Sequence, residues 1–303
     1  SRETELTSLI EYIGDDPLKR DEASVQFIQL MKRSEDIPPE KLASLGRLYE
    51  SLDPIEFYSK QLESGNYYEK SYAVRRLADF NASDKTEDIR KLLDNKRADV
   101  AYNAAMALSE LGDMESVLVF ARKCENNRYY SHRVLLELFQ AYTGDRAELV
   151  RRIFDERSDY IRATCIKAYT SDRIEALAPL YAEGVSSKDS NLKIACVKAL
   201  AQLGNPDYEQ KMITALNDKN WIGRLAAVAG LEKIASGRAL EALVKAVRDE
   251  EWWVRNAAAK AIVNIDFQLV YVEKVLSGYD KYAADAVKNA LYKQINMNGG
   301  GLR

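Results

Sequence analysis

The chain has 303 residues, of which 47% are hydrophobic and 30% are charged, and its formal net charge is −3. This share of hydrophobic residues is enough for a buried core and excludes a disordered chain, and no stretch approaches the roughly 18 apolar residues of a membrane span. The near-even balance of 44 basic and 47 acidic residues argues against a general nucleic-acid-binding protein, which is ordinarily basic.

Residues 1–65 have the hydrophobic spacing of helices but an irregular sequence. They contain four of the six prolines and carry 14 acidic against 8 basic residues. The apolar residues between Leu42 and Tyr49 follow helical spacing and fit one degenerate repeat unit. We therefore predict a region of degenerate helical repeats, or a cap, with an acidic character.

A repeat of about 31 residues covers residues 66–280. Its register is marked by one position in each of seven units: Lys70, Ala101, His132, Arg162, Lys193, Arg224 and Arg255. Small and apolar residues follow at the spacing of a broad helix face, and then comes a break such as Gly112-Asp113 or Gly204-Asn205. A second apolar-periodic stretch follows each break. Each unit is predicted to be helix, tight turn, second helix and loop, and such pairs must stack on their neighbours to bury their faces.

Residues 281–303 contain one more apolar-periodic stretch and then a glycine-rich end. The stretch includes Tyr282, Ala286 and Ala290, and the end reads Gly299-Gly300-Gly301. We predict a C-terminal capping helix followed by a flexible tail.

The repeat residues resemble HEAT repeats, in the short form of the bilin-lyase-like bacterial family. The segments that carry the resemblance are Trp253-Val254-Arg255 through Ala261-Ile262, and Asp99-Val100 through Gly112-Asp113. The resemblance implies an all-α fold, a right-handed α-α superhelix (a HEAT-repeat α-solenoid) of about nine helical pairs. The domains expected from it are residues 1–65, 66–280 and 281–303.

Several basic residues recur at the register position and form a column. Its members are Lys70, Arg162, Lys193, Arg224 and Arg255. The HEAT resemblance implies that they pair with aspartates of neighbouring repeats, and the aspartates that follow first helices are the expected partners: Asp84, Asp113, Asp145, Asp172 and Asp266. The alternative interpretation is an anion-binding edge.

Aromatic residues lie just before most first helices and define an aromatic edge. They are Tyr67, Tyr68, Tyr129, Tyr130, Tyr160, Trp221, Trp252, Trp253 and Tyr282. One interpretation is packing between repeats, and the other is a partner surface, because Trp and Tyr are enriched in binding hot spots. Trp221, Trp252, Trp253, Tyr129 and Tyr130 are the candidates for partner binding. A doublet such as Trp252-Trp253 is hard to bury entirely.

The second helices supply further basic candidates and, by the HEAT resemblance, line the inner curve of the solenoid. Arg122 and Lys123 come from one unit, Arg151 and Arg152 from the next, and Lys245 lies further along the chain. We weigh a docking patch for an acidic segment against an ordinary solvated helix face with i, i+4 pairs.

The cysteine and histidine content limits the chemistry. Cys124, Cys165 and Cys196 are widely spaced, which argues against a disulfide framework or a zinc knuckle and favours packing roles and a reducing, cytoplasmic setting. His132 is the sole histidine and is expected on the surface at the start of a helix, so no metal or cofactor is predicted. Because the chain begins at Ser1, the soluble domain of a membrane-anchored protein is the alternative.

Taken together, these features predict a non-catalytic scaffold that binds a protein or peptide on its concave face or aromatic edge. We expect a monomer with no nucleic-acid partner and no membrane span in the chain. Two alternatives rest on the resemblance alone: a bilin-lyase-like chromophore-handling protein, and a DNA-repair glycosylase on a HEAT scaffold, against which the acidic balance speaks.

Overall fold

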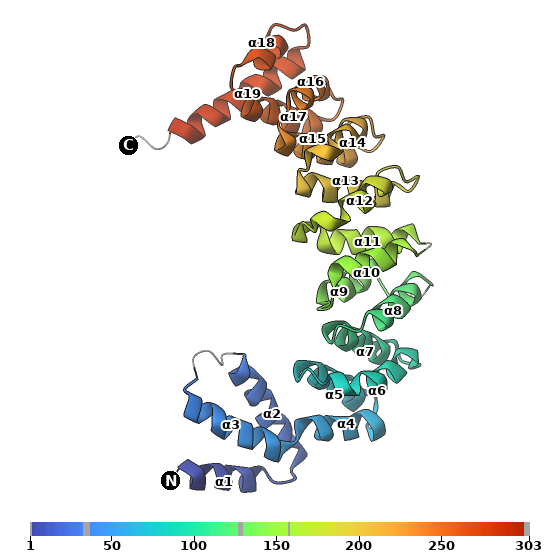
Figure 1. Ribbon diagram of the computed structural model, residues 1–303, viewed down its shortest axis with the longest axis vertical. Coiled ribbons are helices and arrows are strands. Elements are labelled where there is room, and N and C mark those ends of the chain that lie inside the picture. Colours follow the sequence, from blue (N-terminus) through green and yellow to red (C-terminus); the bar gives the residue numbers. More distant parts are fainter. Residues whose placement is uncertain (1, 33–36, 127–129, 157, 300–303) are drawn as a thin grey trace. The chain divides into compact units, whose positions relative to one another are not determined.

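The computed structural model describes residues 2–32, 37–126, 130–156 and 158–299, and every regular element in these ranges is a helix (Figure 1). The helices follow one another as nine pairs, α1–α2 through α17–α18, with α19 after the last pair. The predicted all-α fold of about nine helical pairs is confirmed. Within the described ranges, no helix is both long and apolar enough to cross a bilayer.

The chain divides into two compact units, and the first contains Ser1–Ser131 with Ala141–Gly144. Its helices are α1 (Arg2–Ile13), α2 (Pro17–Met31), α3 (Pro39–Leu52), α4 (Pro54–Ser64), α5 (Tyr67–Asp79), α6 (Thr86–Arg90), α7 (Ala98–Glu110) and α8 (Met114–Asn126). Short 3-10 turns at Ser83–Lys85 and Lys91–Asp94 flank α6.

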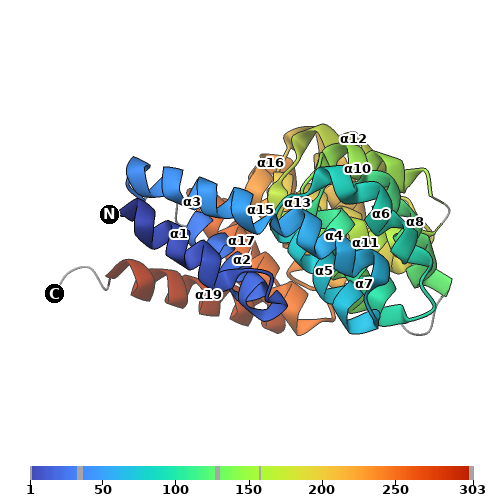
Figure 2. The same cartoon turned by 90° about the horizontal axis from the view of Figure 1, so that it is seen from below.

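The second unit contains His132–Gln140 and Asp145–Arg303. Its helices are α9 (His132–Ala141), α10 (Arg146–Phe154), α11 (Asp159–Tyr169), α12 (Ala178–Gly184), α13 (Ser190–Leu203), α14 (Glu209–Ala215), α15 (Trp221–Ile234), α16 (Gly237–Ala246), α17 (Trp252–Ile265), α18 (Val270–Leu276) and α19 (Lys281–Gly299). Helices α11, α13, α15, α17 and α19 each pack against the next in that order, while α10, α12 and α16 lie on one side of this row (Figure 1, Figure 2).

Side-chain caps explain where the helices of the second unit begin. Asp145, Ser158, Asp189 and Ser236 each accept a hydrogen bond from a backbone N–H in the first turn of the helix that follows. These bonds satisfy N–H groups that have no partner within the helix. At the other end of α13, Gly204 adopts the left-handed conformation (φ 67°), which a glycine adopts without steric cost.

Small residues let the first helices approach one another closely. Gly230 on α15 faces the backbone and Cβ of Ala201 on α13, both 3.2 Å from where its own Cβ would lie. Gly184 at the end of α12 faces Cys196 in the same way. Cys165 and Cys196 are completely buried, so their expected packing roles are confirmed.

The start of the first unit is packed by aromatic rings instead. Phe27, Tyr49, Tyr58 and Phe80 come from α2, α3, α4 and the end of α5, and their ring centroids lie 5.1–6.4 Å apart. Asp21 accepts a hydrogen bond from the buried Tyr58 hydroxyl at 2.7 Å. Large rings replace the small residues of the later repeats, which explains why residues 1–65 depart from the repeat motif.

Candidate functional site

Two members of the predicted basic column join neighbouring repeats. Arg224 on α15 binds Asp249 through two parallel hydrogen bonds, Nε to Oδ2 at 2.7 Å and Nη2 to Oδ1 at 2.8 Å. Lys193 on α13 makes the equivalent ion pair with Asp218 at 2.9 Å. The two aspartates precede α15 and α17, so each pair fastens a first helix to the loop that leads into the next one. The Arg224 side chain is only 9% exposed, which indicates a structural role.

The remaining members of the column do not extend this ladder. Arg162 pairs with Asp159 in its own helix at 3.2 Å. Lys70 Nζ donates to the backbone carbonyl of Glu63 at 3.1 Å. Arg255 donates to two carbonyls of the loop before its own helix, at 2.6 and 2.9 Å. Among the residues that the structure describes, the predicted ladder is therefore present at Lys193 and Arg224 alone.

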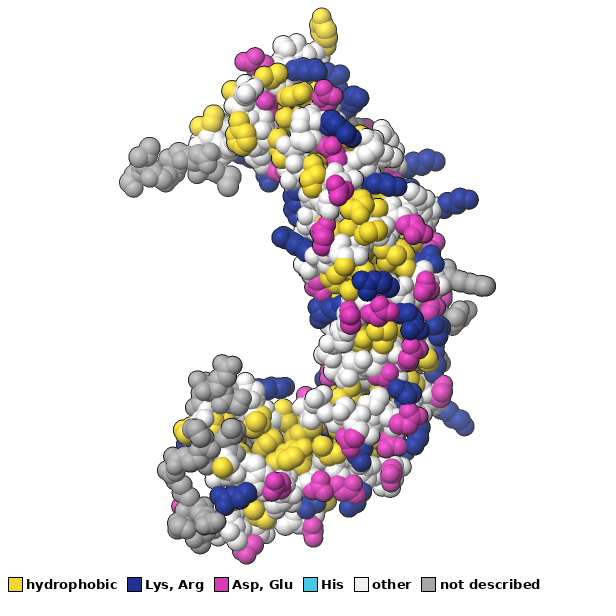
Figure 3. Space-filling model, in the orientation of Figure 1, with side chains coloured by type: hydrophobic (Ala, Val, Ile, Leu, Met, Phe, Trp, Pro, Cys, Tyr) yellow, Lys and Arg dark blue, Asp and Glu magenta, His cyan; other side chains and the backbone are white. Residues whose placement is uncertain are grey.

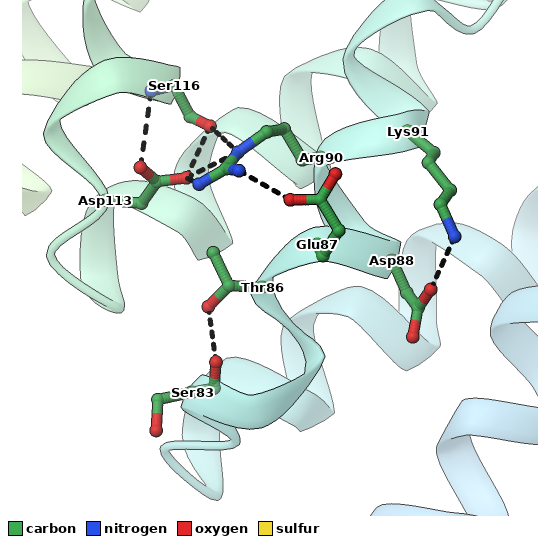
Figure 4. A network of polar contacts seen from close by, with 8 residues as sticks. All are labelled: Ser83, Thr86, Glu87, Asp88, Arg90, Lys91, Asp113 and Ser116. Atoms are coloured by element: carbon green, nitrogen blue, oxygen red, sulfur yellow. Dashed lines mark hydrogen bonds and ion pairs between the residues drawn. The ribbon is translucent and has the colours of Figure 1, made fainter.

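The aspartates that were expected to pair with the basic column bind other groups instead, so that part of the prediction is wrong. These aspartates are Asp84, Asp113, Asp145, Asp172 and Asp266. Asp113 accepts hydrogen bonds from Arg90 of α6 at 3.1 and 2.8 Å and from Ser116 at 2.5 Å (Figure 4). Glu87 binds the remaining Arg90 nitrogen at 2.6 Å. Asp172 binds Arg146 of α10 at 2.7 Å in a similar way.

Two more of these aspartates cap helices: Asp145 caps α10, and the buried Asp266 accepts from the backbone N–H groups of Tyr271 and Val272 at the start of α18. Asp84 lies 3.9 Å from the neighbouring Lys85. A carboxylate just after a first helix lies beside the start of the second helix. There it accepts hydrogen bonds from the N–H groups of that helix start, or from an arginine of the preceding second helix, and not from the basic column.

The two aspartates that do complete the ladder, Asp218 and Asp249, belong to a column that sequence reasoning missed. Asp280 continues this column without a basic partner among the described residues, and the three aspartates follow one another at 31 residues, in the loops before α15, α17 and α19. Each Oδ1 accepts the backbone N–H two residues further on, at 2.8, 2.9 and 3.0 Å. The same 31-residue period that located the basic column would have located this one.

The contacts of Asp218 lower the pKa of its carboxyl group. Burial alone would raise its pKa, but the hydrogen bond from the Asn220 N–H and the pairing with Lys193 hold the pKa below its ordinary value of 3.8. The carboxylate is therefore charged over the whole neutral range, as an ion pair requires.

The aromatic edge divides into packed and exposed members. Tyr130 packs between repeats: its hydroxyl donates to the Ala98 carbonyl at 3.3 Å, and its ring lies 4.8 Å from that of Phe120. Trp221 is half-buried, and Tyr129 lies outside the described residues. The packing interpretation therefore holds for Tyr130.

Trp252 and Trp253 project from the start of α17 and are 55% and 58% exposed. Their rings meet edge to face with centroids 4.7 Å apart. The expectation that this doublet is not entirely buried is confirmed. Two large adjacent aromatic rings in solvent are typical of an interaction surface and unusual for a residue type that dominates protein cores.

Beside the doublet, the outward faces of α15, α17 and α19 form a groove of about 580 Å³, which we call the C-terminal groove. Its lining residues are Leu225, Trp252, Trp253, Asn256, Ala257, Lys260, Val263, Asn264, Ala286, Asn289, Ala290, Lys293 and Gln294. Hydrophobic side chains are visible on the surface over α17 and α19 (Figure 3). Its volume lies within the range of about 300–1,000 Å³ that is usual for ligand-binding clefts.

Carboxamides supply most of the polar lining of the C-terminal groove. Asn256 Nδ2 donates to the Trp252 carbonyl at 2.7 Å, and Asn264 Nδ2 donates to Glu232 at 2.7 Å. Both bonds use the amide NH₂, so the Oδ1 of each side chain is not engaged in them and can accept a hydrogen bond. Sequence reasoning missed the α19 residues of the groove, because a capping helix was expected to close the stack and not to offer a surface.

The basic candidates on the second helices fall into both units. Arg122 and Lys123 belong to the first unit, where Lys123 pairs with Asp94 at 2.5 Å. Arg151 and Arg152 belong to the second unit, where Arg151 pairs with Glu148 at 3.1 Å. The Arg151–Glu148 pair has the i, i+3 spacing of an ordinary solvated helix surface, whereas the Lys123–Asp94 pair joins α8 to the end of the preceding repeat.

Lys245 lies exposed on α16 beside a shallow depression of about 450 Å³ that Asn217, Arg238, Glu241 and Asp249 also line. Both signs of charge occur in this depression, so it offers no single-sign surface to a partner.

The three cysteine thiols are buried, whereas the histidine lies on the surface. Burial raises the pKa of Cys124 and Cys196 to about 12 and raises that of Cys165 further. His132 is exposed at the start of α9, as expected, and the centroid of its ring lies 5.6 Å from that of the Tyr160 ring. No three His, Cys, Asp or Glu side chains gather in a metal-binding arrangement in the part of the chain that the structure describes.

A known family matches part of this region. A sequence model of the family described as HEAT repeats matches residues 209–292, which include Trp252, Trp253 and most of the residues that line the C-terminal groove. No curated protein sequence matches the chain.

Among solved structures, one engineered protein is 16% identical, with 95% of this chain and 88% of that chain covered at a TM-score of 0.44. A second engineered protein is 17% identical over 70% and 96% of the two chains, at a TM-score of 0.35. Human deoxyhypusine hydroxylase in complex with glycerol is 16% identical over 82% and 96%, also at 0.35.

Proposed function

Because the chain contains HEAT repeats and folds as a series of helical pairs, we propose that it is a non-catalytic module that binds a protein or peptide partner. The binding site in this proposal is the C-terminal groove with Trp252 and Trp253 at its rim. A row of stacked repeats offers an extended surface to an extended partner, which suits this role.

The observation that carries the proposal is the exposure of the tryptophan doublet beside an apolar groove. Covering the exposed half of one Trp ring system removes roughly 100–140 Å² of apolar surface from water and stabilises a complex by about 3 kcal/mol. Two such rings supply enough free energy for a hot spot of the kind found at the centre of protein interfaces. The flanking Asn and Lys side chains supply a polar rim.

The proposal is tested by quantitative affinity purification with the whole chain as bait, in wild-type form and as Trp252→Ala/Trp253→Ala. Both side chains are more than half exposed, so the double variant is expected to fold. Partners that bind the groove are lost from the variant by tenfold or more.

Matched controls are Phe267→Ala and Tyr279→Ala, which remove aromatic rings that are 91% and 107% exposed and lie outside the groove. Arg151→Glu reports on the second-helix candidates. Partners that survive loss of the tryptophan doublet but are lost with Arg151→Glu would move the site to the second helices. A wild-type bait with no partner that depends on either surface would refute the proposal.

A further inference from the structure

Four consecutive first helices of the second unit carry charged residues that are mostly basic. Helices α11, α13, α15 and α17 together contain eight Lys and Arg residues and only two acidic ones, Asp159 and Glu232. The second helices α10, α12, α14, α16 and α18 contain seven basic and five acidic residues. The near-even charge of the whole chain thus hides a basic face formed by the first helices.

Part of this basic charge is already neutralised at the helix starts. Lys193 and Arg224 bind the aspartates of the ladder, Arg162 pairs within its own helix, and Arg255 binds backbone carbonyls. These contacts all lie toward the loops that precede the first helices.

Midway along the same helices lies a second, unneutralised set that we call the lysine row: Lys167, Lys198 and Lys260. These residues occupy the same position of the 31-residue period on α11, α13 and α17, and the exposed Ala229 occupies it on α15. All three lysines are exposed, and no carboxylate of the described residues lies within 4 Å of their ammonium groups. Glu232, the one acid in the later turns of these helices, is bound to Asn264.

The lysine row leads into the C-terminal groove. Lys260 belongs to both, and Lys293 of α19 adds a further exposed ammonium to the groove lining. Apolar surface, two exposed tryptophans and a line of unpaired cations therefore form one continuous surface of the second unit.

We propose that this surface binds an acidic linear peptide in extended conformation, with an aromatic or aliphatic anchor in the C-terminal groove and carboxylates along the lysine row. The inference rests on the proposed function and specifies the partner's chemistry. Charge complementarity favours carboxylates in the peptide, because basic side chains of a peptide would be repelled by the lysines of the row.

The groove's carboxamides favour an extended backbone over a helical one. Each Asn or Gln side chain offers one acceptor and an NH₂ donor group. An extended peptide has unpaired N–H and C=O groups for them, whereas a helix has already satisfied its own. For Asn289 and Gln294, no hydrogen bond to another described residue occupies these groups.

The spacing of the row predicts a pattern in the peptide. Packed helix axes lie roughly 8–10 Å apart, and an extended chain advances about 3.3 Å per residue, so about three peptide residues span each first helix. Carboxylates that meet Lys167, Lys198 and Lys260 would then lie at about positions i, i+3 and i+9, with an apolar anchor next to the last.

The test is a selection of random 12-residue linear peptides displayed on phage against the immobilised whole chain. We expect enrichment of peptides with several Asp or Glu residues and one large apolar residue. The best of them is labelled with fluorescein, and its affinity is measured by anisotropy. Lys198→Glu/Lys260→Glu is expected to weaken binding by at least about tenfold, because two attractive contacts become repulsive.

The matched control is Lys211→Glu/Lys245→Glu, which makes the same charge change on α14 and α16 and is expected to alter affinity by less than about twofold. Selected peptides that are neutral or basic, or acidic peptides that respond only to the control variant, would overturn the inference. Tighter binding of labelled single-stranded dT12 than of any selected peptide, lost in Lys198→Glu/Lys260→Glu, would overturn it in favour of nucleic acid.

Trp252→Ala/Trp253→Ala separates this inference from the proposed function. Peptides without acidic bias that still require the tryptophans would refute the acidic partner and leave the groove as a binding site. If the wild-type chain selects no peptide that depends on the tryptophans, both proposals fail.

Discussion

Replacement of Arg224 by Ala is expected to destabilise the chain more than replacement of Lys193 or Lys288, which belong to more exposed ion pairs. Arg224 and Asp249 side chains are only 9% and 11% exposed, and two short hydrogen bonds join them. A further Arg224 nitrogen donates to the carbonyl of Asp218 at 2.9 Å. Loss of the guanidinium leaves a nearly buried carboxylate without its counter-charge.

The expected cost follows from this burial. Removal of one partner of a buried ion pair costs about 3–5 kcal/mol, because the remaining charge stays desolvated. The Lys193–Asp218 pair has the same arrangement, but its lysine is 31% exposed, so Lys193→Ala is expected to cost about 1–2 kcal/mol. Lys288→Ala is the matched control in the same unit. Its pair with Asp285 is 65% and 52% exposed and contributes no more than about 0.5 kcal/mol.

The free energies of unfolding are measured by urea denaturation followed by circular dichroism, with the slope of the transition compared between variants. A double-mutant cycle with Asp249→Ala isolates the coupling, which is expected to be about 1.5–3 kcal/mol. The reasoning is refuted if Arg224→Ala costs no more than Lys288→Ala, or if the cycle gives a coupling below about 0.5 kcal/mol.

Three further outcomes are expected. Gly184→Ala should destabilise the chain by about 1–3 kcal/mol, because the new Cβ would collide with Cys196 Sγ. Gly46 lies in a helix, and no atom lies within 4 Å of where its Cβ would be, so Gly46→Ala should stabilise the chain by about 0.5–1 kcal/mol. Thermal melts of both variants measure the two effects, and equal shifts of the melting temperature would contradict the prediction. The pKa of Asp218 is lower in the folded chain than its ordinary value of 3.8, so its stabilising contribution is complete above about pH 5 and is lost as the pH falls below 3.8. Asp218→Asn should therefore reduce the loss of stability at acid pH in a plot of unfolding free energy against pH. An unchanged acid dependence would count against the pairing. Burial raises the pKa of all three cysteine thiols, so a thiol reagent such as DTNB should titrate three groups only after unfolding, and rapid reaction in the native chain would show that the packing is looser than described.

The 31-residue period was sufficient to predict the helical pairs, because it repeats the apolar faces that must be buried between neighbours. The period also located the buried Cys165 and Cys196 and the exposed tryptophan doublet. These properties depend on local spacing and on the size of a single side chain, both of which the sequence displays directly.

Pairing between distant residues depended on geometry that the period does not contain. The aspartates after first helices were wrong partners for the basic column, because the turn brings them to the start of the next helix or, at Asp113 and Asp172, to an arginine of the preceding second helix. The C-terminal groove was missed for a related reason: α19 contributes Asn289 and Lys293 to it only because the helix packs in register against α17. In residues 1–65, aromatic packing had no repeating spacing to reveal it.

The ladder also bears on how a chain of this kind can change its length. In both of its pairs the cation lies 25 residues before its aspartate, within a period of 31. A duplication or deletion of one whole period therefore restores every pair with a new neighbour, whereas a gain or loss of 30 or 32 residues leaves a nearly buried charge unmatched. The ladder thus favours insertions and deletions of complete 31-residue units, because only these keep the buried ion pairs.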